Sequence, residues 1–324
     1  MKALLCKSLD GPDALEVQEI DAPTPEADQV IVRVRAVGLN FLDTLMTRGR
    51  YQFKPPLPFS PGGEIAGDVL ALGADVQGLN VGDKVCAFVS WGGAREQMAV
   101  AASSVIRMPD TVDYVTAAGI SVTYGTAMHG LRDRGRLQSG ETVAVLGASG
   151  GAGLAAVEIA KLMGARVIAA ASSSEKLEVC RDHGADELLN YSETDVKEGL
   201  RGLTDGRGAD VIYDCVGGPY AEPALRAIAW MGRYLVIGFA AGDIPKFPIN
   251  LMLLKSCDVV GVFWGQQVAR DPGQHRENMK QVLDWVAEGK LKPHVHATYP
   301  LEETGTAIRL LDQRIVKGKV IVTV

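Results

Sequence analysis

The pattern of apolar and polar residues changes once along the chain, near Thr116. Before this point, short runs rich in β-forming residues stand between turn residues, and such runs predict strands. Three of them cover residues 29–37, 65–73 and 84–89. The first third of the chain is therefore predicted to be a β-rich domain.

After Thr116, apolar runs alternate with segments of helical spacing. Six strands are predicted, over residues 142–146, 166–171, 187–189, 211–215, 234–239 and 259–262. Strands that alternate with helices are joined by crossovers, which predicts an α/β fold with a doubly wound parallel sheet. The last of the six strands is expected at an edge of that sheet.

The pattern changes again beyond Trp264. The sequence becomes polar, a helix is predicted over residues 275–288, and a β-like tail ends in Lys319-Val-Ile-Val. Since 324 residues exceed one ordinary core, we expect two domains, with the tail rejoining the first. The predicted bounds are residues 1–120 and 268–324 for the β-rich domain and residues 121–267 for a dinucleotide-binding domain, with the ligand cleft between them.

Composition narrows the class of protein. Hydrophobic residues make up 47% and charged residues 22%, and no apolar run has the roughly 18 to 20 residues of a membrane span. The N-terminal apolar stretch is too short for a signal peptide, and the five scattered cysteines contain no C-x-x-C pair. A net charge of −6 argues against a general nucleic-acid binder. We expect a cytoplasmic protein that binds neither nucleic acid nor a membrane.

The segment over residues 142–153, TVAVLGASGGAG, predicts a nucleotide-binding turn between a strand and a helix. Its small residues at the turn are Gly150, Gly151, Ala152 and Gly153. Glycines let a pyrophosphate approach the backbone, while the helix N-terminus offers unpaired N–H donors. A plain turn is the alternative, but the strand before it and the apolar run after the helix favour dinucleotide binding. Ala148 replaces the first glycine of the general motif.

The residues after the second of these strands indicate which nicotinamide cofactor binds. NAD-selective folds carry a carboxylate there, which accepts hydrogen bonds from the ribose 2′-hydroxyl. This chain has Ser172-Ser173-Ser174 instead, with Lys176 close behind. Hydroxyl donors and a cation suit a 2′-phosphate, so NADPH is predicted rather than NADH. The serines also suit a helix cap, and Tyr191 is a candidate to close over the phosphate.

Several short motifs occur together in one order. They are Val37-Gly-Leu-Asn-Phe-Leu-Asp43, Arg48-Gly-Arg-Tyr51, Pro61-Gly-Gly-Glu64, Val81-Gly-Asp-Lys-Val85, Gly147-Ala-Ser-Gly-Gly-Ala-Gly153, Asp214-Cys-Val-Gly217 and Gly318-Lys319. With them the chain resembles, over nearly its whole length, the medium-chain dehydrogenases/reductases, and within these the zinc-independent NADPH:quinone oxidoreductases. The resemblance implies a β-rich GroES-like catalytic domain and a Rossmann-type domain, and its pattern tolerates Ala148.

The resemblance also bears on metal binding. The zinc alcohol dehydrogenases of this superfamily have a cysteine near Leu39 or Asn40, and Gly-His-Glu where this chain has Gly62-Gly63-Glu64. A catalytic zinc needs three protein ligands, and glycine supplies none. No metal is therefore predicted.

Site residues follow from the same resemblance. It implies that Asn40, Asp43 and Tyr51 line the site in the first domain, with Thr123 and Tyr124 near the nicotinamide. Tyr51 either donates to the quinone oxygen or forms an aromatic wall, and Asp43 either takes part or fixes the Asn40 loop. The further cofactor-binding residues implied are Gly217, Phe239, Phe263 and Lys319. For Phe263 and Trp264, packing in the core is the alternative.

Hydride transfer to a quinone is the predicted reaction, because an acceptor whose anion is delocalised needs no Lewis acid. The protein then mainly orients the nicotinamide and the acceptor. Two alternatives stay open: an enoyl- or acrylyl-CoA reductase acting on a conjugated C=C bond, and a non-catalytic NADPH-binding protein. A homodimer is expected, because sheet edges such as residues 259–262 pair across dimers in this family.

Overall fold

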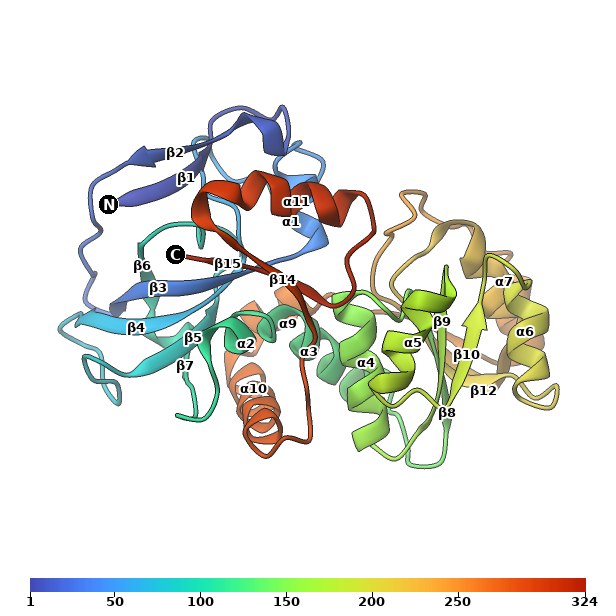
Figure 1. Cartoon of the computed structure of the whole chain (residues 1–324). Coiled ribbons are helices and arrows are strands. Elements are labelled where there is room, and N and C mark those ends of the chain that lie inside the picture. Colours follow the sequence, from blue (N-terminus) through green and yellow to red (C-terminus); the bar gives the residue numbers. More distant parts are fainter. The chain divides into compact units, whose positions relative to one another are not determined.

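The computed structural model describes all 324 residues. Its chain divides into two compact units (Figure 1). The first unit comprises Met1–Val122, Gln267–Gly289 and Pro293–Val324, and the second comprises Thr123–Gln266 and Lys290–Lys292.

A seven-stranded sheet forms the centre of the first unit, in the order β14-β15-β3-β4-β5-β7, with β6 also paired to β3. The strands are β3 (Gln29–Leu39), β4 (Glu64–Leu72), β5 (Lys84–Phe88), β6 (Gln97–Ala101), β7 (Val105–Arg107), β14 (Val295–Pro300) and β15 (Lys319–Thr323). A separate antiparallel pair is formed by β1 (Lys2–Cys6) and β2 (Leu15–Glu19). The strands predicted over residues 29–37, 65–73 and 84–89 are confirmed, with ends shifted by one or two residues.

The C-terminal tail completes this sheet. Strand β15 pairs antiparallel with β3, so that Val320 lies opposite Leu39, and the red and blue strands are neighbours in Figure 1. The expectation that the tail rejoins the first part of the chain is therefore confirmed. The core beneath is apolar and includes Val32, Val34 and Ile65. Between Val32 and Val34, Arg33 is exposed, as the alternation of side chains along a strand requires.

Short helices cover the first unit. They are α1 (Phe41–Met46), α2 (Tyr114–Ala118), α10 (Pro272–Ala287) and α11 (Thr304–Asp312), with 3-10 turns η1 (Pro12–Ala14), η2 (Ala102–Ser104) and η5 (Leu301–Glu303). The helix predicted over residues 275–288 is confirmed as α10, which begins earlier because Asp271 caps it and Pro272 occupies its first position. Helix α9 (Trp264–Arg270) belongs to both units.

The second unit contains a sheet of six strands, all parallel, in the order β10-β9-β8-β11-β12-β13. The strands are β8 (Thr142–Leu146), β9 (Arg166–Ala171), β10 (Glu187–Asn190), β11 (Ala209–Asp214), β12 (Ile228–Val236) and β13 (Asp258–Gly261). Relative to the first strand of the unit this is the order 3-2-1-4-5-6 of dinucleotide-binding sheets. The predicted doubly wound fold is confirmed, and β13 lies at the expected edge.

Helical segments precede the first of these strands and join the others. They are α3 (Ser121–Met128), the π-helical η3 (His129–Arg134), α4 (Gly151–Leu162), α5 (Ser174–Asp182), α6 (Val196–Gly202), the 3-10 turn η4 (Gly218–Tyr220), α7 (Ala221–Arg226) and α8 (Asn250–Lys255). Strand β8 is buried along its whole length, as expected for a parallel strand covered on both faces.

One strand prediction was wrong in its bounds. The strand predicted over residues 234–239 is β12, which begins at Ile228 and ends at Val236. Its early part is irregular, because the register to β11 shifts and Met231 adopts a positive φ of 59°. Its end is fixed by Ile237 and Gly238, whose N–H groups both donate to the carbonyl of Asp214. The sequence pattern carries no signal for either feature.

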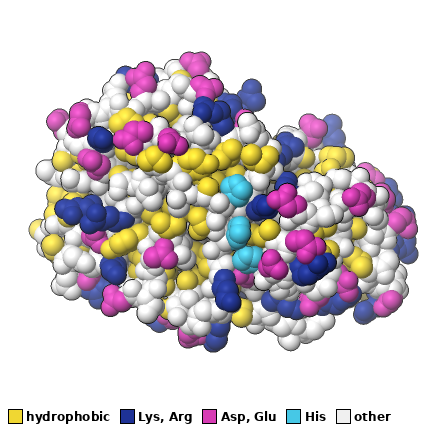
Figure 2. All heavy atoms as spheres, viewed as in Figure 1, with side chains coloured by type: hydrophobic (Ala, Val, Ile, Leu, Met, Phe, Trp, Pro, Cys, Tyr) yellow, Lys and Arg dark blue, Asp and Glu magenta, His cyan; other side chains and the backbone are white.

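No helix of the structure is both long enough and apolar enough to cross a membrane. Side chains of both charge signs are scattered over the visible surface, without a large patch of one sign (Figure 2).

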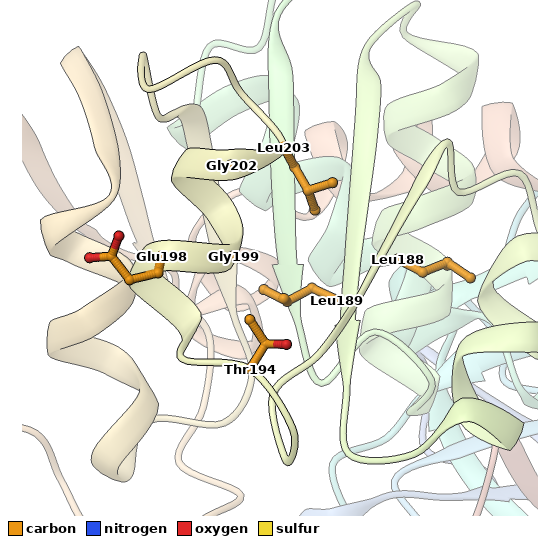
Figure 3. A pocket seen from close by; sticks show the side chains of 7 residues that line it. All are labelled: Leu188, Leu189, Thr194, Glu198, Gly199, Gly202 and Leu203. Atoms are coloured by element: carbon orange, nitrogen blue, oxygen red, sulfur yellow. The ribbon is translucent and has the colours of Figure 1, made fainter.

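A shallow hollow of about 340 Å³ lies between β10 and α6 (Figure 3). It is lined by Leu188, Leu189, Thr194, Glu198, Gly199, Gly202 and Leu203. Its only charged side chain, Glu198, points away from the two β10 leucines in Figure 3. None of the predicted site residues lines it, so this hollow is not the predicted site.

Candidate active site

The glycine turn lies between β8 and α4 and has the shape that phosphate binding requires. Gly147 has a φ of +71°, and a Cβ atom on Gly153 would lie 2.2 Å from the Gly147 carbonyl oxygen. Only glycine at position 153 therefore lets the helix approach the turn this closely. Gly150 is the N-cap of α4, no side chain caps this helix end, and its first turn contains no acidic residue. An anion at this end would meet backbone N–H donors and the positive end of the helix dipole.

The residues predicted to bind a 2′-phosphate come together at the ends of β9 and β10. Lys176 Nζ donates to Ser172 Oγ at 3.3 Å. Tyr191 follows β10, and its backbone N–H donates to the Ala171 carbonyl at 3.1 Å. Its phenol shares a hydrogen bond with the Ser172 side chain, and burial is the main reason that its pKa is raised to about 12. The Lys176 ammonium and the Tyr191 phenol are thus both hydrogen-bonded to the Ser172 hydroxyl.

The two roles predicted for residues 172–174, helix cap and phosphate ligand, fall on different serines. Ser173 is the N-cap of α5, and its hydroxyl accepts from the Lys176 backbone N–H at 3.4 Å. Ser172 does not cap the helix; its hydroxyl faces Lys176 and Tyr191. One serine therefore fixes the helix and its neighbour is in position to meet a ligand.

Gly217 belongs to a turn that the buried Asp214 organises. The Asp214 carboxylate accepts the backbone N–H groups of Val216 at 2.8 Å and of Gly217 at 3.0 Å. It also accepts the hydroxyl of Tyr234. Burial raises the pKa of Asp214, while these hydrogen bonds act against that rise. Sequence reasoning quoted Asp214 in a motif but missed this role, for which a carboxylate directly after a buried strand was the available signal.

The aromatic residues of the second unit fall into two groups. Phe239 lies next to Gly217, because a Cβ atom on that glycine would lie 3.0 Å from the Phe239 ring. Phe239 and Phe263 are partly exposed, at 37% and 45%. Trp264 is buried, and its indole lies against α3 where Gly125 leaves room for it. Of the alternatives for the Phe263-Trp264 pair, packing in the core applies to Trp264.

Thr123 and Tyr124 are both buried in α3. The Tyr124 hydroxyl donates to Glu158 of α4, a carboxylate that His183 also contacts at 2.9 Å through Nδ1. The Lys292 backbone N–H donates to the same carboxylate at 3.2 Å. Sequence reasoning missed Glu158, since a single acidic residue in an apolar helix carries no partner signal.

In the first unit, Asn40, Asp43, Glu64 and Lys319 form a buried group that we call the Lys319 cluster. Lys319 Nζ donates to the Leu39 carbonyl, to Asn40 Oδ1 and to Glu64 Oε1, each at 2.7 Å. Asn40 Nδ2 donates to the same Glu64 oxygen at 2.9 Å. A buried ammonium and a buried carboxylate thus neutralise one another around the Asn40 side chain.

These contacts change the role of Lys319, which the resemblance placed among the cofactor-binding residues. An ammonium has three N–H donors, and all three have partners: two within the cluster and the Leu39 carbonyl beside it. None of the three is left over for a further acceptor in this arrangement. Lys319 instead orients Asn40, a role that depends on a tail strand 279 positions further along the chain.

Asp43 fixes the loop of Asn40. Its carboxylate accepts the backbone N–H of Asn40 at 2.8 Å and that of Gly62 at 2.9 Å. It is fully buried, and burial raises its pKa from 3.8 to about 6, against the effect of these hydrogen bonds and of Lys319. The nearby Glu64 adds to the rise.

Tyr51 is half-buried and packs beside Cys6, Met46 and Phe59. Burial, followed by the charge of Asp43, raises the pKa of its phenol. Tyr51 therefore keeps its proton at neutral pH and remains a hydrogen-bond donor. The three residues predicted to line the first domain's site, Asn40, Asp43 and Tyr51, lie close enough to interact.

No three His, Cys, Asp or Glu side chains come together anywhere in the structure in a way that could hold a metal ion. At Gly63, where the zinc enzymes have histidine, a Cβ atom would lie 2.8 Å from the Ser90 carbonyl oxygen. Gly62 has a φ of +88°, and a Cβ atom there would lie 2.4 Å from Val37. This backbone leaves no room for a ligand side chain at either glycine.

Two family models match the chain: "Alcohol dehydrogenase GroES-like domain" over residues 26–110 and "Zinc-binding dehydrogenase" over residues 151–288. Quinone oxidoreductase-like protein 2 of Rattus norvegicus is 39% identical over 324 residues, which is 99% of this chain and 92% of that protein. A quinone oxidoreductase structure from Pseudomonas syringae has a TM-score of 0.93 and 30% identity, covering 100% of this chain and 99% of that one. The Escherichia coli quinone oxidoreductase complexed with NADPH has a TM-score of 0.92 and 26% identity, with both chains covered completely.

A GroES-like unit joined to a parallel dinucleotide-binding sheet defines the class as a nicotinamide-dependent oxidoreductase. Within that class, the chain belongs to the medium-chain dehydrogenases/reductases of the quinone oxidoreductase type. The resemblance identified from the sequence motifs is thereby confirmed.

Proposed function

We propose that the protein is an NADPH-dependent reductase that transfers hydride to a quinone without a metal ion. The observation that carries this proposal is the group of Ser172, Lys176 and Tyr191 after β9 and β10. Two hydroxyls and a cation, with no carboxylate among them, match a 2′-phosphate and would not select a free 2′-hydroxyl. The glycine turn before α4 follows β8, the strand beside β9, and supplies the pyrophosphate site.

NADPH, when bound, supplies the hydride from its nicotinamide ring. The chain's own residues bind and orient it: Gly150–Gly153 at the pyrophosphate, Ser172 with Lys176 and Tyr191 at the 2′-phosphate, and Gly217 with Phe239 along the nucleotide. From the family resemblance, Thr123 of α3 would lie near the nicotinamide. Phe263 is exposed enough to contact a ligand.

At the acceptor, Tyr51 donates its phenolic hydrogen bond to the quinone oxygen that becomes negative. Its raised pKa keeps the proton on the phenol at neutral pH. Asn40 lines the site in an orientation set by Lys319 and Glu64, and Asp43 acts by fixing the Asn40 loop. A quinone suits this site because its reduced form delocalises the negative charge, so hydrogen-bond donors suffice.

Independence from metal is part of the proposal. Its support is the backbone at Gly62 and Gly63, which has no space for a ligand side chain, and the ammonium of Lys319 that already balances Glu64. Elemental analysis of purified protein tests it directly. One zinc per chain would contradict the proposal.

The catalytic test compares kcat/KM for NADPH oxidation with a panel of small quinones and with acrylyl-CoA and crotonyl-CoA. Preference for quinones by a hundredfold or more supports the proposal. Preference for the thioesters would replace it by reduction of a conjugated C=C bond, and NADPH binding without turnover of any acceptor would indicate a binding protein.

We further propose that two copies associate through β13, the edge of the parallel sheet. Large apolar side chains are exposed on β12 and α8 near this edge, among them Trp230 at 67%, Met231 at 66% and Leu253 at 79%. Such exposure is unusual for a free surface and typical of an interface. The mass in solution at micromolar concentration, measured by light scattering, should be that of two chains and should fall to one chain in Trp230→Ser/Leu253→Ser. A single-chain mass for the wild type would overturn this proposal.

A further inference from the structure

An aromatic pair joins two segments of the second unit that are distant in sequence. The ring centroids of Tyr191, after β10, and Tyr220, at the end of η4, are 4.5 Å apart with an angle of 39° between the planes. Both rings pack against the apolar core beneath the sheet. Tyr220 belongs to none of the motifs by which the family resemblance was recognised.

Tyr191 is the aromatic member of the proposed phosphate site. Its phenol shares a hydrogen bond with the Ser172 hydroxyl, which also accepts from Lys176 Nζ at 3.3 Å. The backbone here is held by Ser192, whose hydroxyl donates to the Ser172 carbonyl at 2.9 Å. One face of the Tyr191 ring is supported by the facing ring of Tyr220, in addition to its packing against the apolar core.

Tyr220 is well placed to act as this support because its own turn is anchored. Gly217 and Gly218 both have positive φ values, 66° and 57°, which other residues rarely adopt. The Gly217 N–H donates to Asp214 at 3.0 Å, and the Gly218 N–H donates to the Asp243 carbonyl at 3.1 Å. Ala221, which follows Tyr220 and begins α7, is fully buried. The ring therefore projects from a backbone with little freedom.

We infer that Tyr220 is a positioning residue for the cofactor's 2′-phosphate: by packing against Tyr191 it holds the Tyr191 and Ser172 hydroxyls and the Lys176 ammonium around one anion. This inference rests on the proposed function, since it takes NADPH as the cofactor. Tyr220 thereby contributes to the choice of NADPH over NADH without contacting the phosphate. It also links the phosphate site to the Gly217 turn, so that one rigid segment serves both.

The experiment measures equilibrium binding of NADPH, NADH and 2′,5′-ADP to the full-length protein by calorimetry. Tyr220→Ala should weaken the binding of NADPH and of 2′,5′-ADP roughly three- to tenfold, the range expected for loss of an aromatic pair. NADH affinity should stay within twofold. Tyr220→Phe keeps the ring and should retain wild-type affinity for all three ligands.

A double-mutant cycle separates positioning from direct contact. If Tyr220 acts through Tyr191, then Tyr191→Ala/Tyr220→Ala should bind NADPH no more weakly than Tyr191→Ala alone. Additive losses in the double variant would overturn the inference, as would an equal loss of NADH and NADPH affinity in Tyr220→Ala. Unchanged NADPH affinity in Tyr220→Ala would overturn it too.

The wild-type protein gives the separate test of the underlying proposal. If it binds NADH as tightly as NADPH, the proposed cofactor is wrong and the inference falls with it. If it prefers NADPH and Tyr220→Ala keeps that preference in full, only the inference is wrong. Unchanged NADH binding shows that each variant is folded, and Tyr220→Leu, which fills similar space without a ring, replaces Tyr220→Ala where the smaller side chain prevents folding.

Discussion

Asp43→Asn tests the electrostatics of the Lys319 cluster through the pH dependence of stability. Asp43 is fully buried, and its pKa is raised from 3.8 to about 6, chiefly by burial. The folded state therefore holds this proton more tightly than the unfolded state. The stabilising contribution of protonation is complete below pH 3.8, falls as the pH rises, and is lost above about pH 6.

The size of the effect follows from the two pKa values. Between pH 3.8 and about 6, the free energy of unfolding contributed by Asp43 falls by about 1.4 kcal/mol per pH unit, or about 3 kcal/mol in all. An asparagine at position 43 does not titrate. The substitution also removes one of the two oxygen acceptors for the N–H groups of Asn40 and Gly62, which lowers the free energy of unfolding by about 1 to 3 kcal/mol at every pH.

The assay is urea unfolding of wild type and Asp43→Asn at half-unit steps from pH 4 to pH 7.5. The difference between their free energies of unfolding should change with pH by about 3 kcal/mol, with the wild type losing stability relative to the variant as the pH rises. Asp195→Asn, at the exposed N-cap of α6, is the matched control for an aspartate-to-asparagine change outside the Lys319 cluster. A pH-independent difference for Asp43→Asn would refute the argument that burial raises the pKa of Asp43.

Three further substitutions test the proposed site. Gly153→Ala puts a Cβ atom 2.2 Å from the Gly147 carbonyl oxygen and should weaken NADPH binding at least tenfold. Gly202→Ala, where a Cβ atom meets no atom within 4 Å, is the control and should bind NADPH as the wild type does; equal NADPH affinities of the two variants would contradict the assignment of the turn. Lys176→Ala should weaken NADPH binding about tenfold and leave NADH binding unchanged, both measured by calorimetry, with Lys197→Ala on α6 as the control. An equal loss of affinity for both cofactors would argue against a 2′-phosphate site. Tyr51→Phe should lower kcat for quinone reduction roughly tenfold or more at unchanged NADPH affinity, and a wild-type kcat would leave Tyr51 as an aromatic wall. Tyr114→Phe, which removes a hydroxyl that donates to Asp68, is the control and should leave kcat unchanged.

Local sequence signals were sufficient for most of the second unit. Strands β8 and β9 follow the predicted bounds to the residue, because a buried parallel strand is a continuous apolar run that ends at glycine or serine. The Gly150–Gly153 turn and the Ser173 cap are likewise encoded within a few residues. Strand β12 was misplaced because its start depends on a bulge opposite β11, which has no local pattern.

The polar contacts of the first unit could not be read in the same way, because they join residues far apart in sequence. Asn40, Glu64 and Lys319 were each visible as members of a motif, yet only the pairing of β15 with β3 places the ammonium beside the amide and the carboxylate. A lysine after a terminal glycine has no property, taken alone, that separates a phosphate ligand from a buried counter-ion. The contacts of the Lys319 ammonium distinguish the two. Its three N–H groups all donate short hydrogen bonds, and the neighbouring Glu64 carboxylate offsets the cost of burying its charge. The tail strand is thus part of the site's electrostatics, since without it Glu64 would be a buried charge with no cation and the Asn40 side chain would lose one of the two contacts that orient it.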